Sequence, residues 1–418
     1  MSQDSGCAAP SSSPASLTVD AARRLIFDRL TPVGGYERIA LRAALGRILA
    51  EPVIAPCNVP AHDNSAMDGY AIRADDLPES GEASFQVVGT AYAGRGFSGI
   101  VGAGQAVRIM TGAVVPMGAD TIVVQEIVQT DGDRVVVPPG QRRGQNLRRA
   151  GEDLALGAIA LPAGKRLGPA ELGLVASLGI AEVSVTRRLR VAFFSTGDEL
   201  ASIGRPLAPG EVYDSNRYTL FGALTRLGCD LLDMGVIRDE PESMESAFRE
   251  AARHADVIIT TGGVSVGEAD FIRDLMARLG EVSFWKLEIK PGRPMAFGRL
   301  GSAWMFGLPG NPVAVMVTFY QFVQDALLHL GGLTPLPERP LVPAECADAI
   351  RKQPGRREFL RGRLSREDGI WKVRLSGAQG SGILRSMSEA NCFIVLEETR
   401  GNVAPGDAVS VQLFDGLI

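Results

Sequence analysis

The spacing of apolar residues changes character several times along the chain, and each change predicts a different kind of structure. Residues 18–30 carry apolar side chains at helical spacing, with Thr18 as a plausible N-cap and Pro32 beyond the end. Residues 39–50 have a similar pattern and predict a second amphipathic helix. Short β runs follow at 85–88, 106–110, 121–128 and 134–137, the last two joined by Asp-Gly-Asp. A helical pattern returns at 169–178, so the β-rich unit is interpreted as an insertion into a helical domain.

From residue 189 the pattern alternates between buried-type strands and amphipathic helices, which predicts a parallel sheet with helices on both faces. A hairpin-like segment at 295–308 and an apolar helix at 312–330 follow. A proline-rich linker then leads into short strands, which predict a small β domain. The predicted fold class is multi-domain α/β plus β. Its parts are a disordered tail (1–16), a segmented helical domain (17–55 and 147–188), an inserted β-rich domain (56–146), an α/β domain (189–332) and a C-terminal β domain (333–418).

Composition narrows the possible functions. The chain has 418 residues, is 45% hydrophobic and has a net charge of −5, which argues against nucleic-acid or membrane-surface binding. Five cysteines without paired spacing predict reduced thiols and a cytoplasmic protein. The three histidines have no neighbouring cysteine, which argues against a zinc, haem or iron–sulfur site. No apolar run reaches the length predicted for a membrane span, and the first residues lack the pattern of a signal peptide.

The segment TTGGVSVGEAD lies between a buried-type strand and a helix and is the sharpest chemical feature. Gly262, Gly263, Ser265 and Gly267 with Asp270 are typical of a loop that holds phosphate or another oxyanion at the carboxyl edge of a sheet. A plain strand-to-helix turn is the alternative. The same letters contain GxSxG, the nucleophile motif of serine hydrolases, but the only later histidine, His329, lies in an apolar helix.

Two further polar segments should reach the same sheet edge. In STGDE, Asp198 and Glu199 follow a buried strand and suit magnesium beside a phosphate, or else cap a helix. In YDSN, Asp214 or Ser215 either caps the next helix or contacts a ligand.

Cationic and rigid segments complete the predicted pocket. Lys286 and Lys290 are spaced as on one face of an extended strand, and with Arg293 they would form an oxyanion site, unless they are solvated surface residues. The turn LPGNP has Pro312 at a first helical position and Asn311 as its cap, and could form a pocket wall.

Four further candidate residues can be explained by ordinary structural roles in turns, loops or the first turns of helices. Asp68 in NSAMDGYA and Thr111 in IMTGA both lie in turn-like segments of the β-rich unit. Asp153 and Asp239 are typical loop or first-turn acids. From the residues alone, none of the four has a decisive role.

Eight segments taken together, in this order and spacing, resemble the MoeA family of molybdopterin molybdenumtransferases: NSAMDGYA, IMTGA, AGED, STGDEL, YDSN, TTGGVSVGEAD, FWKLEIKPGRPMAFG and LPGNPVA. The resemblance runs from about residue 17 to 418. It implies a homodimer of four-domain subunits that insert molybdate into adenylylated molybdopterin and release AMP with the help of Mg²⁺.

The resemblance also assigns residues. The family's functional acids fall on Asp68, Asp153, Glu199, Asp239 and Asp270, with Thr111 alongside, and its basic and proline positions fall on Lys286, Lys290, Pro309 and Pro312. Glu199 and Asp270 are the tentative magnesium ligands. The expected partners are a molybdopterin adenylyltransferase and proteins that mature molybdoenzymes.

Three other functions share features with this sequence. An adenylyltransferase of the preceding step has a similar glycine loop but lacks the other three domains. A dimeric scaffold related to this fold would have lost the acids, which are all present here. A nicotinamide oxidoreductase is disfavoured because GxGxxG is absent.

Overall fold

A computed structural model describes residues 16–263 and 269–414 of the chain, with the side chains of 269–273 left aside. The described chain forms two compact units. One comprises residues 38–185, and the other comprises residues 16–37 together with 186–414.

The larger unit contains a seven-stranded mixed sheet. In spatial order its strands are β1 (Ser16–Leu17), β19 (Gly280–Leu287), β21 (Pro294–Leu300), β22 (Ala303–Leu308), β18 (Val257–Thr261), β14 (Arg190–Thr196) and β17 (Asp230–Ile237). Strands β22, β18, β14 and β17 are parallel, as the alternating pattern predicts, and β21–β22 form the predicted antiparallel hairpin.

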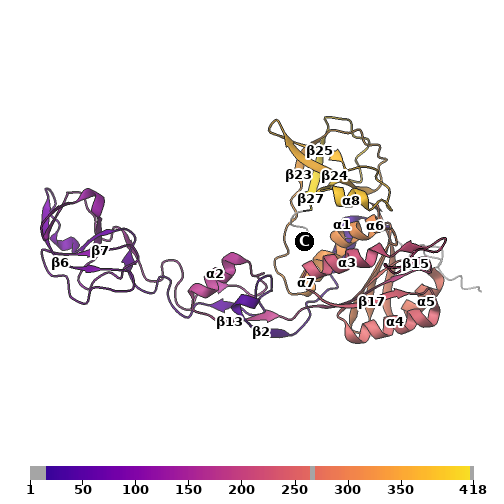
Figure 1. Ribbon diagram of the computed structural model, residues 1–418, viewed down its shortest axis with the longest axis horizontal. Helices are drawn as coiled ribbons and strands as arrows, with labels where there is room; N and C mark the ends of the chain where they lie inside the picture. The colour runs from indigo at the N-terminus through magenta and orange to yellow at the C-terminus, as the bar shows by residue number, and fades with distance from the viewer. Residues whose placement is uncertain (1–15, 264–268, 415–418) are drawn as a thin grey trace, which may run out of the picture. The chain divides into compact units, whose positions relative to one another are not determined.

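Helices cover both faces of this sheet (Figure 1). On one face, α1 (Val19–Phe27), α3 (Ser215–Arg226) and the helix that begins with α6 (Pro312–Thr318) pack against Phe193, Phe297 and Phe306. On the other face, α4 (Pro241–His254) and α5 (Ala269–Leu279) pack against Ala192 and Phe194. The helix predicted at 18–30 is confirmed, with the Thr18 side chain accepting the Ala21 N–H at its N-cap.

The most apolar helix is the centre of this core. It continues from α6 through a π-helical turn, η4 (Phe319–Val323), into α7 (Gln324–Leu330). Contrary to the expectation from sequence, this 19-residue helix is long and apolar enough to cross a membrane, but 78% of its apolar window is buried inside the protein. Burial among the sheet and α1 explains its composition.

The C-terminal strands form a closed barrel. Its strands are β23 (Val342–Cys346), β24 (Arg357–Glu367), β25 (Ile370–Leu375), β26 (Cys392–Leu396) and β27 (Ala408–Leu413), and pairing of β24 with β26 closes the circle. A short helix, α8 (Arg385–Glu389), contacts β24. The strand β20 (Ile289–Lys290) leaves the α/β domain and pairs with β24, so the barrel is joined to that domain by backbone hydrogen bonds.

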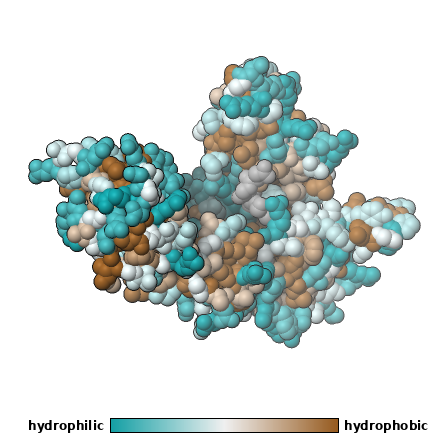
Figure 2. Space-filling view, turned by 60° about the vertical axis from the view of Figure 1, so that its left-hand side comes forward, coloured by the Kyte–Doolittle hydropathy of each residue, from teal (hydrophilic) through white to brown (hydrophobic). Residues whose placement is uncertain are grey.

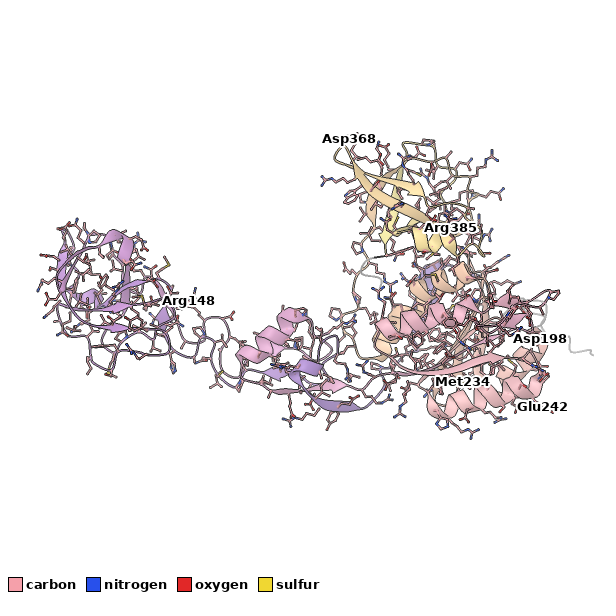
Figure 3. All side chains as sticks on the ribbon, in the orientation of Figure 1. Arg148, Asp198, Met234, Glu242, Asp368 and Arg385 are labelled. Atoms are coloured by element: carbon pink, nitrogen blue, oxygen red, sulfur yellow. The ribbon has the colours of Figure 1, made fainter. Side chains whose placement is uncertain are left out.

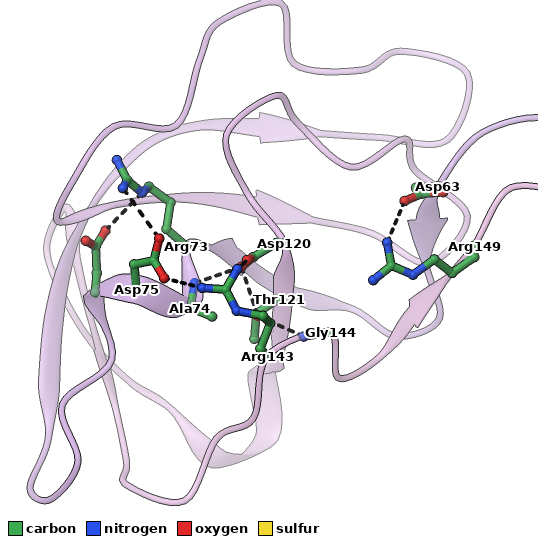
Figure 4. Close-up of polar contacts among 10 residues, drawn as sticks. Asp63, Arg73, Ala74, Asp75, Asp120, Thr121, Arg143, Gly144 and Arg149 are labelled. Atoms are coloured by element: carbon green, nitrogen blue, oxygen red, sulfur yellow. Dashed lines mark hydrogen bonds and ion pairs between the residues drawn. The ribbon is translucent and has the colours of Figure 1, made fainter.

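The smaller unit contains the predicted β-rich region. Its six-stranded sheet runs, in spatial order, β8 (Thr121–Val124), β5 (Gly69–Ile72), β7 (Gln105–Ile109), β6 (Ala83–Ala91), β10 (Arg134–Val137) and β9 (Gln129–Asp131). The Asp-Gly-Asp turn joins a hairpin as expected, but its first strand is β9 and not the predicted run 121–128, which forms β8 and pairs with β5. Beside the sheet, Arg143 forms ion pairs with Asp75 and Asp120 and so ties the returning chain to it (Figure 4).

The remainder of the smaller unit differs from the sequence prediction. The helix α2 (Pro169–Ser177) is present and packs with the short pair of β3 (Val53–Ile54) and β12 (Ile159–Leu161). A second short pair joins β4 (Asn64–Ser65) to β11 (Leu147–Arg148), and Leu147 packs against the core of the six-stranded sheet. The prediction of a helix at 39–50 is wrong. This segment begins as strand β2 (Tyr36–Ala40), which pairs with β13 (Glu182–Thr186), and makes only one 3₁₀ turn before Gly46, whose φ is +75°. Pairing with a distant strand overrides the amphipathic pattern.

Replacement of Gly298 by alanine should destabilise the larger unit. A Cβ at this position in β21 would lie 2.0 Å from the Glu281 carbonyl oxygen in the neighbouring strand. Because the atom it meets belongs to the backbone, relief of this contact requires an energetically costly shift of a strand. We expect the free energy of unfolding to fall by about 1–3 kcal/mol. Denaturant unfolding monitored by tryptophan fluorescence measures this change. Gly34→Ala is the control, since nothing lies within 4 Å of its Cβ position. Equal stability of the two variants would contradict the packing described here.

Candidate functional site

A cavity of about 1160 Å³ lies in the larger unit, where the carboxyl ends of β14, β18 and β22 face the C-terminal barrel. Its α/β wall includes Thr196, Glu199, Gly262 and Gly310, and its barrel wall includes Arg361. Ligands in open α/β sheets bind at this edge.

The floor of the cavity depends on the parallel pairing of β14 with β18, in which Ser195 lies opposite Thr261. Gly262 has φ +87°, and a Cβ there would lie 2.4 Å from the Thr196 carbonyl oxygen. Only glycine therefore fits this close approach. The prediction that the STGDE segment and the glycine loop reach the same edge is confirmed. Of that loop, Gly262 and Gly263 line the cavity, whereas Ser265, Gly267 and the side chain of Asp270 lie outside the described residues.

A chain of buried hydrogen bonds joins three elements beneath the cavity. The Thr261 hydroxyl donates to Ser195 Oγ at 3.0 Å, and Ser195 donates to Asp214 Oδ1 at 3.0 Å. The same Asp214 oxygen accepts the Arg217 N–H at 3.2 Å and caps α3. Asp214 thus caps the helix and also lines the cavity, together with Ser215.

Carboxylates gather at the same edge. Glu199 and Asp239 line the cavity, and Asp198 Oδ1 accepts the Asp239 N–H at 3.4 Å. The alternative that Asp198 or Glu199 caps a helix is wrong, because the next element is a short strand, β15 (Leu200–Ala201). Figure 3 labels Asp198 on the larger unit. Hard oxygen donors of this kind suit Mg²⁺, although the described part of the chain brings no three candidate ligands together.

The cationic wall differs from the prediction. Lys286 and Lys290 do not share one strand face, because β19 ends at Leu287 and Lys290 lies in β20, which pairs with the barrel. Lys290 Nζ bonds both carboxylate oxygens of buried Glu358, at 3.2 and 3.3 Å. Lys290 and Arg293 line the cavity. Lys286 is not among the lining residues.

The barrel contributes cations that the sequence did not indicate, namely Arg351, Arg356 and Arg361. Arg361 is fully buried, and its guanidinium donates to Ser386 Oγ at 3.0 Å and to the Ala378 and Gly380 carbonyls at 3.1 and 2.9 Å. Its Nη1 has no partner among the residues described. Burial lowers the pKa of Arg361 to about 10, so the group keeps its charge at neutral pH. An arginine in a strand pattern gives no sign of such burial.

The turn at 308–312 forms part of the wall, as expected. Pro309, Asn311 and Pro312 line the cavity, and Pro312 begins α6 at a first helical position. Asn311 holds the N-cap position, but its side chain makes no capping hydrogen bond. The Asn216 side-chain amide donates to the Gly310 carbonyl at 2.6 Å and fixes the turn instead.

Asp68 and Thr111 meet in the smaller unit. The backbone N–H and the hydroxyl of Thr111 both donate to Asp68 Oδ1 at 2.7 Å. These hydrogen bonds, the backbone one first, lower the pKa of the Asp68 carboxyl. Asp153 is exposed in the same unit, with its N–H bonded to the Val59 carbonyl.

The remaining nucleophilic and basic groups lie away from this chemistry. Burial raises the pKa of the Cys229 and Cys392 thiols to about 12, so neither is a thiolate at neutral pH. His329 packs edge-on against Phe27, as its apolar helix predicts.

Comparison with known proteins decides the family. Three family descriptions match consecutive parts of the chain: "MoeA N-terminal region (domain I and II)" at residues 17–179, "Probable molybdopterin binding domain" at 192–329 and "MoeA C-terminal region (domain IV)" at 343–414. The chain belongs to the MoeA family. It is therefore an enzyme of molybdenum cofactor biosynthesis that acts as a molybdopterin molybdenumtransferase.

Relatives and solved structures cover nearly the whole chain. The molybdopterin molybdenumtransferase of Haemophilus influenzae is 44% identical over 96% of this chain and all of that protein. That of Bacillus subtilis is 34% identical over 91% of this chain and 90% of the relative. The crystal structure of the MoeA protein from Pyrococcus horikoshii OT3 aligns with a TM-score of 0.82 and 29% identity, covering 96% of this chain and 100% of that one. These matches support the multi-domain MoeA fold.

Removing the Thr111 hydroxyl should raise the pKa of Asp68. Thr111→Val deletes one of the two donors, whereas Thr111→Ser keeps both. Because the folded-state pKa is lowered, the contact stabilises the fold above the ordinary carboxyl pKa and is lost as the pH falls through the lowered value. We expect the carboxyl titration of Asp68, followed by NMR, to move up in the valine variant only. An unchanged titration would show that the hydroxyl does not hold the carboxylate.

Proposed function

We propose that the cavity of this MoeA-family chain binds adenylylated molybdopterin and molybdate, inserts molybdenum into the dithiolene and releases AMP. The observation that carries the proposal is the convergence of three chemistries on one cavity: glycines at a sheet edge, the carboxylates Glu199 and Asp239, and a cationic wall that includes Lys290. In the insertion, the two dithiolene sulfurs bond to molybdenum, one Mo–O bond of molybdate breaks, and its oxygen leaves as water with the two thiol protons, so the oxidation state of molybdenum does not change.

Cleavage of the bond to AMP is a hydrolysis. Water adds to phosphorus in the linkage between the molybdopterin phosphate and the nucleotide, the bridging P–O bond breaks, and the proton of water passes to a base. We assign the orientation of this water to Glu199 and Asp270; Asp239 lines the same cavity as Glu199. A carboxylate oxygen about 2.6–3.2 Å from a water oxygen can both orient the water and accept its proton.

Magnesium fits this edge. We assign its protein ligands to Glu199, which lines the cavity, and Asp270, since Mg²⁺ in such sites is usually held by one or two carboxylates and substrate phosphate. When bound, it would neutralise charge that develops on the phosphate oxygens.

We assign Lys290 and Arg293 to the tetrahedral oxyanion, molybdate or phosphate, with Arg361 behind them. Guanidinium and ammonium groups recognise such oxyanions through charge-assisted hydrogen bonds. The sequence predicts the same role for Lys286, but Lys286 is not among the residues that line the cavity, so we assign the oxyanion to the other cations.

We further propose that the chain acts as a homodimer. The smaller unit exposes Leu156, Ile159 and Ile54, at 64%, 63% and 45% of their surface, and the last two are cross-strand neighbours. Apolar patches on the surface (Figure 2) are typical of contacts between copies. In such a dimer Asp68 would act in the partner's cavity. A cytoplasmic location, substrate supply by a molybdopterin adenylyltransferase and delivery to molybdoenzyme-maturation proteins complete the proposal.

Asp270→Asn should separate binding from catalysis. We expect molybdate-dependent release of AMP to fall about 100-fold or more, because a carboxylate that orients or deprotonates water contributes at least this much. Affinity for adenylylated molybdopterin should stay within about threefold. Asp274→Asn, an exposed change on the same helix, is the matched control. Near-normal turnover of the Asp270 variant would remove this residue from the mechanism.

Mixed dimers test the role of Asp68. One chain carries Asp68→Ala and the other Asp270→Ala, with two different tags for purification of the heterodimer. If Asp68 serves the partner's cavity, one intact site remains, and the heterodimer should keep about half the wild-type rate of AMP release. Both variant homodimers should be inactive. A heterodimer as inactive as the homodimers would place both residues in one chain's site.

A further inference from the structure

Three buried oxygens in the α/β wall of the cavity have no hydrogen-bond partner among the described residues: Thr196 Oγ1, Asp214 Oδ2 and Asn216 Oδ1. Their residues are only 4%, 2% and 7% exposed, and all three line the cavity. Buried polar atoms in native proteins are nearly always paired, and an unpaired one costs desolvation free energy. Three in one wall indicate that a ligand supplies their donors.

Neighbouring hydrogen bonds fix what two of these atoms can do. Asp214 uses Oδ1 for Ser195 and for the Arg217 N–H, which leaves Oδ2 as a separate acceptor. Asn216 donates from Nδ2 to the Gly310 carbonyl, so its Oδ1 is the acceptor end of the amide. The Thr196 hydroxyl lies beside Gly262, 2.9 Å from the Cβ position of that glycine. The wall is therefore an acceptor surface at the sheet edge.

An acceptor surface selects a ligand edge that carries several donors. The pterin ring has an amino group next to a ring N–H, which gives adjacent donors on one edge. Adenine, the other heterocycle of adenylylated molybdopterin, pairs its amino donor with a ring-nitrogen acceptor. That acceptor would face the oxygens of Asp214 and Asn216 unfavourably. The donor pattern thus favours the pterin ring over adenine.

We propose that Thr196, Asp214 and Asn216 form the subsite that binds the amino and ring N–H edge of the pterin. The proposal rests on the proposed function, because it assigns one half of that substrate. The Asp214 carboxylate accepts the pterin donors through Oδ2, while the Ser195 hydroxyl and the Arg217 N–H hold its other oxygen in place. The nucleotide end of the substrate is then left to the carboxylates and the basic barrel wall.

Asp214→Asn tests the subsite with little structural cost. Asparagine caps a helix as well as aspartate does, and its oxygen can still accept from Ser195 and the Arg217 N–H. Its amide nitrogen, however, places a donor where Oδ2 accepts. We expect the KM for adenylylated molybdopterin to rise about 10- to 100-fold, as for the loss of a hydrogen bond to a charged group, with kcat within about threefold. If Asp214 only capped the helix, the substitution would leave KM unchanged, and that result would overturn the proposal. Asp368→Asn, on the barrel away from the cavity lining, is the control (Figure 3).

A second measurement identifies which edge of the heterocycle the subsite binds. The competitors are 6-hydroxymethylpterin, 6-hydroxymethyllumazine (which has an oxo group in place of the amino group) and adenosine. The wild type should be inhibited at least tenfold more strongly by the pterin than by the lumazine, and Asp214→Asn should lose this preference. Adenosine should inhibit both proteins equally. Equal inhibition by pterin and lumazine, inhibition by neither, or an effect of the variant on adenosine alone would overturn the assignment. Absence of molybdate-dependent AMP release in the wild type would instead contradict the proposed function, and the pterin preference would then be tested by direct binding of the pterin and the lumazine, measured by isothermal titration calorimetry.

Discussion

The parallel pairing of β14 with β18 is the constraint on which the site depends. It places Ser195 opposite Thr261, and so brings the STGDE segment and the glycine loop to one edge. Gly262 can then approach the Thr196 carbonyl more closely than any side chain would allow. From the same strand ends, the Thr261 hydroxyl donates to Ser195, and the Ser195 hydroxyl donates to Asp214 and so joins α3 to the sheet. The floor of the cavity is thus one hydrogen-bonded structure.

A second constraint holds the barrel against this floor. The β20–β24 pairing places Lys290 beside Glu358, and Arg357 bonds Asp20 of α1 at 3.0–3.1 Å. Arg339, in the linker, reaches Asp325 inside the helix core. Burial raises the pKa of Asp325, and loss of one partner in such a buried pair typically costs about 3–5 kcal/mol. The cavity walls therefore keep a fixed separation although they come from two domains.

Sequence patterns predicted the parts of the fold that depend on local spacing. The strand and helix alternation from residue 189, the hairpin at β9–β10 and the cap of α1 followed from periodicity and turn residues. The structure of segment 39–50 did not follow from periodicity, because the strand with which it pairs is about 140 residues away along the chain. The same limit applies to the site. The sheet-edge motifs could be grouped because carboxyl ends of parallel strands meet, whereas Arg361 and Glu358 belong to a barrel whose docking no local pattern encodes. Lys290 illustrates both cases. Its local motif predicts a cation at the cavity, but the pairing of its strand with the barrel does not follow from local sequence.

Anomalous X-ray scattering at the molybdenum edge, from crystals of the protein soaked with molybdate and AMP, tests the central claim most directly. If the cavity between the strand ends and the barrel is where molybdenum is inserted, the anomalous peak should lie inside it, beside Lys290 and Arg293. A peak found only elsewhere on the protein, in crystals whose dissolved enzyme is active, would contradict the account.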